Sequence, residues 1–268
     1  MRPEWGPMHG PKAVAASEQA LFEKALDRLP AGAIAMTDSN FGVFSVAYAA
    51  TQRQHPVLLR LTLARAQSLA GEKLYDGIDR EVEWKPSRYE RGKHPGLPKN
   101  ACVRGRLLVR KVQPEGKQPF LLAVFTTLTA PEEEIFTAYG QRWLVETDLR
   151  TLKSTLHLDQ LTCATPDMVA KEIEMGITAY NLVRATIALA SLQSGIAPRG
   201  YRFTKVRRLL EAYGRDLAIA PDDASAQRIL EQMMQQVQRS KQYPRKRKRP
   251  SYPRATWKRG ASFPNRKK

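Results

Sequence analysis

The sequence predicts an α/β protein whose first part contains parallel strands and whose last third is helical. Three observations support this fold class. Helical and strand-like segments alternate near the start of the chain, which is typical of a parallel sheet covered by helices. Short alternating runs separated by proline and glycine follow, and long amphipathic segments come last. Hydrophobic residues make up 42% of the 268 residues, enough for a buried core.

The first elements are expected to alternate between helix and strand. Ser17 is a suitable N-cap for a helix whose apolar residues recur at helical spacing. The next apolar segment is short and ends in Asp38, which predicts a buried strand. After an irregular stretch over 1–16, the expected elements are a helix over 17–29, a strand over 33–38, a turn over 39–42, a helix over 43–54 and a strand over 56–61.

The region 64–127 changes character and is expected to form an antiparallel β insertion. Its alternating runs cover 79–84, 103–109 and 120–126, and a basic loop over 85–99 contains most of the turn-forming residues. The last run is a candidate to return to the main sheet.

The remaining chain is expected to be helical as far as residue 239. Pro131 and three following glutamates suit the first turn of a helix that runs to about residue 155. The predicted organisation is an irregular start over 1–16, a partial core over 17–63, the insertion over 64–127, a glutamate-bearing helix over 128–160 that completes the core, a helical region over 161–239 and a tail over 240–268.

Positive charge is concentrated in the tail. The chain contains 44 Lys+Arg and 26 Asp+Glu, a net charge of +18, but residues 240–268 hold 12 of the basic residues and no acid. The other 239 residues therefore have a net charge of only +6. Prolines and like-charge repulsion predict disorder in the tail. Its cations could neutralise phosphates and its aromatic rings could stack on bases, with a merely solubilising tail as the alternative.

Several classes of protein are disfavoured by composition. The two cysteines, Cys102 and Cys163, are far apart, which predicts a reducing compartment and no zinc site. The best apolar run, Ala185–Leu192, is too short for a membrane span, and the start has no signal-peptide pattern. No glycine-rich nucleotide loop is present. We therefore expect a cytoplasmic protein with a polyanionic partner, no membrane contact and no small-molecule substrate.

One helix face carries the residues with the clearest chemical pattern. If residues 131–155 form a single α-helix, five side chains share a stripe less than a quarter of its circumference. They are Tyr139, Arg142, Glu146, Arg150 and Lys153. A solvated face with ordinary salt bridges is the alternative interpretation. An acid at a strand end, Asp38, together with Glu146 would suit Mg²⁺ or Mn²⁺, and the cations would hold a nucleic-acid backbone beside the metal.

These residues resemble a known family. The pattern Tyr139-x2-Arg142-x3-Glu146-x6-Lys153 is similar to the signature of the fourth family of bacterial insertion-sequence transposases. The turn from Thr37 to Gly42 resembles the turn that carries the second catalytic acid in that family, although Ser39 departs from the common arginine. The resemblance covers roughly residues 17–192.

The resemblance implies a DDE transposase with an RNase H-like, retroviral-integrase-like core and Mg²⁺-dependent cleavage and joining of DNA. Asp38 would be the second catalytic acid and Glu146 the third, and both would bind metal. Tyr139, Arg142, Arg150 and Lys153 would contact DNA at the transposon end, with Trp143 as a support residue. The partners would be transposon ends and target DNA, bound by a homo-oligomer.

The first catalytic acid of the family has no clear counterpart here. Only Asp27 precedes Asp38, and it lies inside the expected first helix. We therefore expect an N-terminally incomplete copy that is weakly active or inactive by itself.

Other interpretations stay open at this stage. A non-catalytic DNA-binding remnant would keep the stripe and the tail, and an unrelated RNA-binding protein would share only the charge. A second basic cluster, residues 199–208, is as compatible with a solvated helix face as with DNA contact. His157 is interpreted as structural.

The tail can be tested directly. Deleting residues 240–268 is expected to weaken DNA binding at all sequences and to flatten its salt dependence, because fewer counterions are released from DNA. Binding isotherms over a series of salt concentrations measure this slope, and an unchanged slope would show that the tail does not contact DNA.

Overall fold

The computed structural model describes residues 18–114 and 118–241, so the expected irregular start over 1–16 and most of the tail lie outside the described residues. The chain divides into two compact units, which are described separately. Within the described residues, the sheet unit comprises 31–132 and the helical unit comprises 18–30 and 133–241. The expected completion of one core by residues 17–63 and 128–160 stays a prediction.

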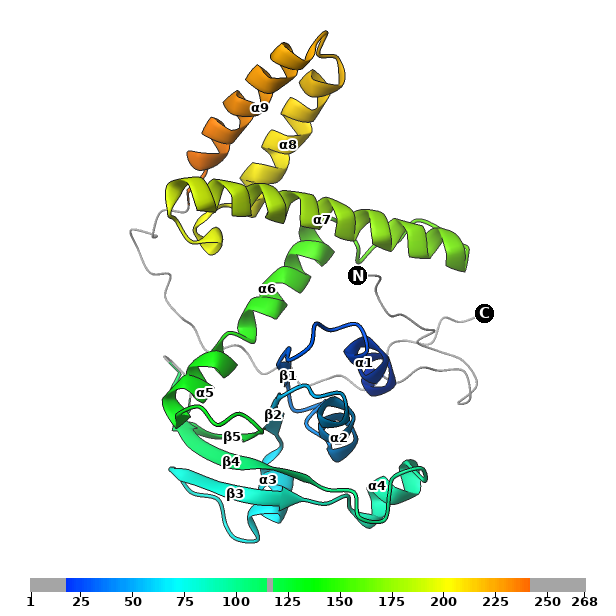
Figure 1. The fold of residues 1–268 in the computed structure, drawn as a ribbon, viewed down its shortest axis with the longest axis vertical. Coiled ribbons are helices and arrows are strands. Elements are labelled where there is room, and N and C mark those ends of the chain that lie inside the picture. The colour runs from blue at the N-terminus through cyan, green and yellow to red at the C-terminus, as the bar shows by residue number, and fades with distance from the viewer. Residues whose placement is uncertain (1–17, 115–117, 242–268) are drawn as a thin grey trace, which may run out of the picture. The chain divides into compact units, whose positions relative to one another are not determined.

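The sheet unit contains five strands and three helices (Figure 1). In chain order they are β1 (Ala35–Thr37), α2 (Phe44–Gln52), β2 (Val57–Leu61), α3 (Leu63–Ala70), β3 (Ile78–Trp84), α4 (Arg88–Lys93), β4 (Val103–Val112) and β5 (Phe120–Thr126). Every strand predicted from the sequence is present. The two short helices α3 and α4 were not predicted, because they lie among residues whose pattern indicated strands and loops.

All five strands form one mixed sheet in the order β1-β2-β5-β4-β3. The strands β1 and β2 are parallel, with Ala35 opposite Val57, as the alternation of helix and strand predicted. The other neighbours are antiparallel. The strand β5 lies between β2 and β4, so the return of residues 120–126 to the main sheet is confirmed. The strands of the expected insertion thus extend the sheet that begins with β1 and β2.

A row of aromatic rings joins the predicted insertion to the rest of the sheet unit. Trp84, at the end of β3, contacts Phe125 of β5 at a ring separation of 5.0 Å and Phe44 of α2 at 6.0 Å, both edge to face. Phe44 and Phe125 are fully buried. Such pairs contribute about 0.5–1.5 kcal/mol beyond burial of their area. The three rings therefore fix β3 and α2 against the central strand.

The short helices have clear local causes. Thr62 caps α3 by accepting a hydrogen bond from the amide of Arg65, and Gly71 ends it in a left-handed conformation with φ of 72°. Ser87 and Glu90 form a capping box at the start of α4. The second carboxylate oxygen of Glu90 also accepts from the amide of Phe44 at 3.1 Å. The loop predicted as merely basic therefore contains a helix that caps α2.

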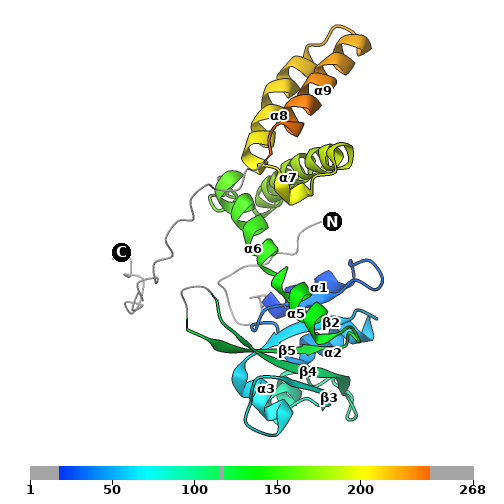
Figure 2. The ribbon, with the colours of Figure 1, turned by 90° about the vertical axis from the view of Figure 1, so that its left-hand side faces the viewer.

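The helical unit consists almost entirely of helices. They are α1 (Glu18–Leu26), α5 (Glu132–Gly140, which begins at the unit boundary), α6 (Trp143–Arg150), the π-helix η1 (Thr151–Thr155), α7 (Pro166–Ser194), the 3-10 turn η2 (Pro198–Gly200), α8 (Phe203–Ala218) and α9 (Asp223–Gln238). The helices α8 and α9 lie side by side in both views, and α7 crosses their base (Figures 1 and 2). Their shared core contains Ile187, Val206 and Val237, all fully buried.

The sequence predicts no apolar run long enough for a membrane span, but the helix α7 is long enough. It has 29 residues and an 18-residue window of mean hydropathy 1.2, so its length and composition alone would allow a membrane span. However, Arg184 within α7 forms an ion pair with Asp148 of α6. Ile187 and Ala190 are buried in a core shared with α8 and α9. The C-terminal half of α7 therefore packs in the core of the helical unit, although only 22% of its apolar window is buried.

Gly42 provides a test of the sheet unit. A Cβ atom at this position would lie 2.0 Å from the carbonyl oxygen of Arg60 in β2, and a backbone atom cannot move aside. We expect Gly42→Ala to lower the free energy of unfolding of the sheet unit by about 1–3 kcal/mol. Native-state hydrogen exchange of the β2 amides measures this change.

The matched control is Gly92→Ala in α4, where an added Cβ meets no atom within 4 Å. This variant is expected to be neutral or slightly stabilising, because alanine is the better helix former. Equal exchange rates in the two variants would contradict the close approach of Gly42 to β2.

Candidate functional site

Asp38 lies directly after β1, at the end of the parallel pair, as the sequence predicted. Its Oδ1 accepts a hydrogen bond from the amide of Asn40 at 2.9 Å, which closes a tight turn. The turn continues to Gly42, whose carbonyl oxygen accepts from Nη1 of Arg65 in α3 at 2.6 Å. The turn that carries the Asp38 carboxylate is therefore held by β1 at its start and by α3 at its end.

The helix that carries Glu146 is not the single α-helix predicted for 131–155. It is interrupted between Gly140 and Trp143, where the amides of Gln141 and Arg142 bond to carbonyls three residues back. It ends in a π-helix in which the amide of Leu156 bonds to Thr151, five residues back. The prediction that all five side chains share one narrow stripe is therefore wrong in detail. Each departure from α-helical geometry rotates the side chains that follow it.

Three of the five stripe residues nevertheless lie together. Nη2 of Arg142 donates a hydrogen bond to Oε1 of Glu146 at 2.7 Å. The Arg142 guanidinium also lies 6.0 Å from the ring centre of Tyr139, within cation–π range. The Arg142 side chain is 23% exposed and that of Glu146 37%, so the pair is reachable from solvent. Tyr139 is buried and supports Arg142 from below the surface.

The other predicted site residues on this segment are exposed. Arg150 ends α6 and Lys153 lies in the π-helix, and both side chains are open to solvent. Neither forms a salt bridge among the described residues. Trp143, predicted as a support residue, is 52% exposed at the start of α6.

A second group on α6 was not identified from the sequence. Both carboxylate oxygens of Asp148 accept hydrogen bonds from Arg199, at 2.8 and 2.6 Å, in a two-pronged pair. Arg184 of α7 donates to the same carboxylate. Burial alone would raise the pKa of Asp148, but the Arg199 hydrogen bonds and the nearby arginine charges outweigh it and hold that pKa below its usual value. Asp148 thus connects α6 with α7 and with the turn before α8.

Arg184 is held on its other side by two aromatic rings. Its Nε donates to the hydroxyl of Tyr180 at 2.8 Å. Its guanidinium lies 5.2 Å from the Tyr180 ring and 5.4 Å from the Phe203 ring, and these rings stack on each other. The arginine is therefore fixed in place by charge and by packing at once.

Glu172 fixes the loop that follows the signature. Its carboxylate accepts from the amide of Thr162 at 3.0 and 3.1 Å and from the amide of Cys163 at 3.0 Å. These two backbone hydrogen bonds are the main reason that the pKa of Glu172 falls from 4.5 to about 2. Close packing of Gly176 in α7 against Leu158 holds the same loop, since an added Cβ would lie 2.6 Å from that leucine.

Comparison with known proteins identifies the family. The family model "Transposase DDE domain" matches residues 14–182, more than half of the chain. The chain belongs to this family of DDE transposase domains. A curated relative, "Transposase InsG for insertion sequence element IS4" from Escherichia coli (strain K12), is 28% identical over 196 residues. The aligned part covers 70% of this chain and 43% of the relative, so the chain spans less than half of that protein.

Membership in the DDE family implies an RNase H-like fold and a divalent metal. The expected α/β fold class is confirmed by the mixed sheet and its helices. Asp38 and Glu146 carry the hard oxygen donors that such metals prefer, and one oxygen of each has no hydrogen bond within the described residues. The described residues contain no group of three acidic, His or Cys side chains that could hold a metal. Asp38 belongs to the sheet unit and Glu146 to the helical unit.

The pKa of Glu172 in this DDE domain gives a pH test. Because its pKa is lowered from 4.5 to about 2, its contribution to stability is complete above pH 4.5 and is lost as pH falls through about 2. We expect the amide NMR shifts of Thr162 and Cys163 to titrate with a midpoint near 2.

Glu172→Gln is the control, because its amide oxygen still accepts a hydrogen bond but does not titrate. The step near pH 2 should vanish from both amides in this variant. A midpoint near 4.5 in the unmodified protein would contradict the hydrogen bonds from the Thr162 and Cys163 amides to Glu172.

Proposed function

We propose that this chain acts in DNA transposition, binding the ends of an insertion sequence and catalysing metal-dependent cleavage and strand transfer at phosphodiester bonds. The observation that supports this most directly is the group of Tyr139, Arg142 and Glu146, in which a carboxylate and a guanidinium share one exposed surface. Membership in the DDE transposase family supports the reaction class.

Asp38 and Glu146 are the proposed catalytic acids and metal ligands. A divalent cation, Mg²⁺ or Mn²⁺, would activate the attacking oxygen and stabilise the leaving oxygen when bound. The chain itself contributes two oriented carboxylates. Asp38 is held by the turn that follows β1, and Glu146 is held by the hydrogen bond that it accepts from Arg142.

The cations around Glu146 are the proposed DNA contacts. Arg142 presents its guanidinium beside the carboxylate, and this planar cation is well suited to a phosphate oxygen. Arg150 and Lys153 are exposed further along the segment and suit neighbouring phosphates. Tyr139 is buried, so in this proposal it positions Arg142 through ring contact.

The setting of the reaction follows from the same assignment. The curated relative is a bacterial transposase, so we infer a cytoplasmic protein that acts on DNA. Nucleoid association, homo-oligomer formation on DNA and contact with target DNA belong to the proposal.

A second candidate function is DNA binding without catalysis. The same exposed cations would serve it, and a complete metal centre would not be needed. Metal binding therefore separates the two candidates more sharply than DNA binding does.

The metal site can be measured through Mn²⁺ bound to the chain in the presence of duplex DNA that carries the element ends. We expect Asp38→Asn and Glu146→Gln each to weaken Mn²⁺ affinity by at least about tenfold, because each removes a charged oxygen ligand. Electron paramagnetic resonance of free Mn²⁺ gives the affinity. Any Mg²⁺-dependent nicking of the same duplex should disappear in both variants.

Glu134→Gln is the matched control, since Glu134 is an exposed acid one helix earlier in the chain. It should leave Mn²⁺ affinity and DNA binding unchanged. Unaltered Mn²⁺ affinity in both Asp38→Asn and Glu146→Gln, with DNA binding intact, would favour the non-catalytic candidate.

A further inference from the structure

We propose that the helical unit contains a second DNA-backbone site, a basic cleft between α6, α7 and the start of α8. The inference rests on the proposed function only in that the polyanion is DNA. The cleft has a volume of about 690 Å³ and lies entirely within the helical unit. Five cationic side chains line it: Arg184, Arg199, Arg202, Lys205 and Arg208.

These cations fall into two classes. Arg184 and Arg199 are tied to Asp148, the acid that lies beside the cleft. Arg202, Lys205 and Arg208 are exposed and form no salt bridge with any of the residues that the structure describes. Asp148 thus pairs with two of the five cations, and the positive charge of the other three is available to a ligand.

The three uncommitted cations form a row. Lys205 and Arg208, three residues apart, share one side of α8, and Arg202 is the N-cap residue directly before that helix. At 1.5 Å of rise per residue the row extends about 9 Å. Duplex DNA carries one charge per about 1.7 Å of its axis, so such a row can meet several phosphates.

The cleft is built on fixed elements. Val206, between the cations, is fully buried in the core shared by α7, α8 and α9. Phe203 stacks on Tyr180 at a ring separation of 5.4 Å, beneath Arg184. The backbone that carries the row is therefore held before any ligand arrives, which lowers the entropic cost of binding.

The cleft is distinct from the surface around Glu146. Leu144, Thr147 and Thr151 contribute the α6 side of the cleft. At about 100° per residue, Thr147 and Glu146 point to different sides of α6, and Leu144 lies roughly 160° from Glu146. The signature contacts and the cleft thus occupy opposite sides of one helix.

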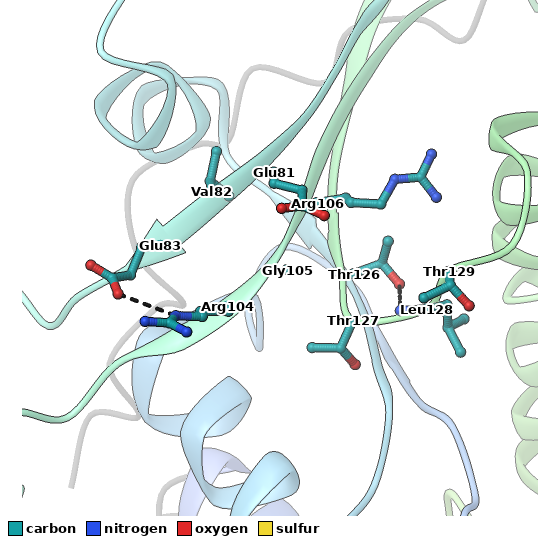
Figure 3. A pocket seen from close by; sticks show the side chains of 10 residues that line it. All are labelled: Glu81, Val82, Glu83, Arg104, Gly105, Arg106, Thr126, Thr127, Leu128 and Thr129. Atoms are coloured by element: carbon teal, nitrogen blue, oxygen red, sulfur yellow. Dashed lines mark hydrogen bonds and ion pairs between the residues drawn. The ribbon is translucent and has the colours of Figure 1, made fainter.

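A hollow in the sheet unit also contains arginines, but unlike those of the α8 row they are paired with acids (Figure 3). It has a volume of about 510 Å³ and also contains two arginines. Arg104 pairs with Glu83, and Arg106 pairs with Asp79 at 2.6 Å. Their charge is already compensated, so this hollow does not suit a polyanion, whereas the α8 row does.

The experiment compares the full chain with a variant that replaces Arg202, Lys205 and Arg208 by glutamine. Each removed phosphate contact lowers the salt slope of binding by about 0.9, so we expect a slope reduced by about 3. Affinity for a short duplex of arbitrary sequence should fall by at least about tenfold at low salt. Fluorescence anisotropy over a salt series gives both quantities.

The matched control replaces three exposed cations of the helical unit that do not line the cleft, Lys171, Arg215 and Arg228, by glutamine. It removes the same charge, so it separates the cleft from general electrostatic attraction. Circular dichroism and thermal unfolding should be unchanged in both triple variants, because every replaced side chain is exposed. A single variant, Lys205→Gln, with an expected slope change of about 0.9, serves if the triple variant unfolds.

The outcomes separate the two proposals. If the unmodified chain does not bind duplex DNA, the proposed function fails and the cleft assignment fails with it. If it binds, and the cleft and control variants have equal slopes, only the cleft assignment is overturned. A slope change seen with RNA of the same length but absent with duplex DNA would also overturn it.

Discussion

The antiparallel pairing of β2 with β5 is the constraint on which the sheet unit depends. It joins the parallel pair β1–β2 to the antiparallel strands β5, β4 and β3, which otherwise share no edge. Two threonines strengthen the contact between β2 and β5. The hydroxyl of Thr126 donates to the carbonyl of Val57 at 2.7 Å. The hydroxyl of Thr127 accepts from the Val57 amide at 3.0 Å. Gly42, at the end of the Asp38 turn, closely approaches the Arg60 carbonyl of the same strand β2, so the position of the proposed catalytic acid depends on the pairing.

In the helical unit, Asp148 is the residue on which the contacts between α6, α7 and the turn before α8 depend. One carboxylate binds an arginine from α7 and another from the turn before α8. Removing it would leave two arginine side chains, 23% and 41% exposed, without their anion. The cost of such a loss exceeds that of a surface ion pair, because part of the charge is withdrawn from water. The pair therefore positions α6, with Glu146 on its other side, against α7.

The sequence was sufficient where the signal is local or where a simple period applies. The strands, the parallel pair and the Arg142–Glu146 contact follow from apolar patterning and from spacing of four residues. The break after Gly140 and the π-helix over Thr151–Thr155 could not be predicted from such patterns. Both depend on which carbonyl oxygen each amide binds, and tertiary packing decides that choice. Asp148 was missed because its partners lie 36 and 51 residues away.

The availability of charge, more than its amount, distinguishes the two units. In the sheet unit, Arg104, Arg106 and Arg110 each pair with a carboxylate of the same unit, so the hollow beside the first two offers little net attraction. In the helical unit, Asp148 compensates Arg184 and Arg199 but leaves the α8 row exposed. A polyanion gains most where cations are already held in place and not yet paired, since no internal ion pair must be broken. The DNA-backbone contacts that we propose for the described residues are therefore centred on α6 and α8 of the helical unit.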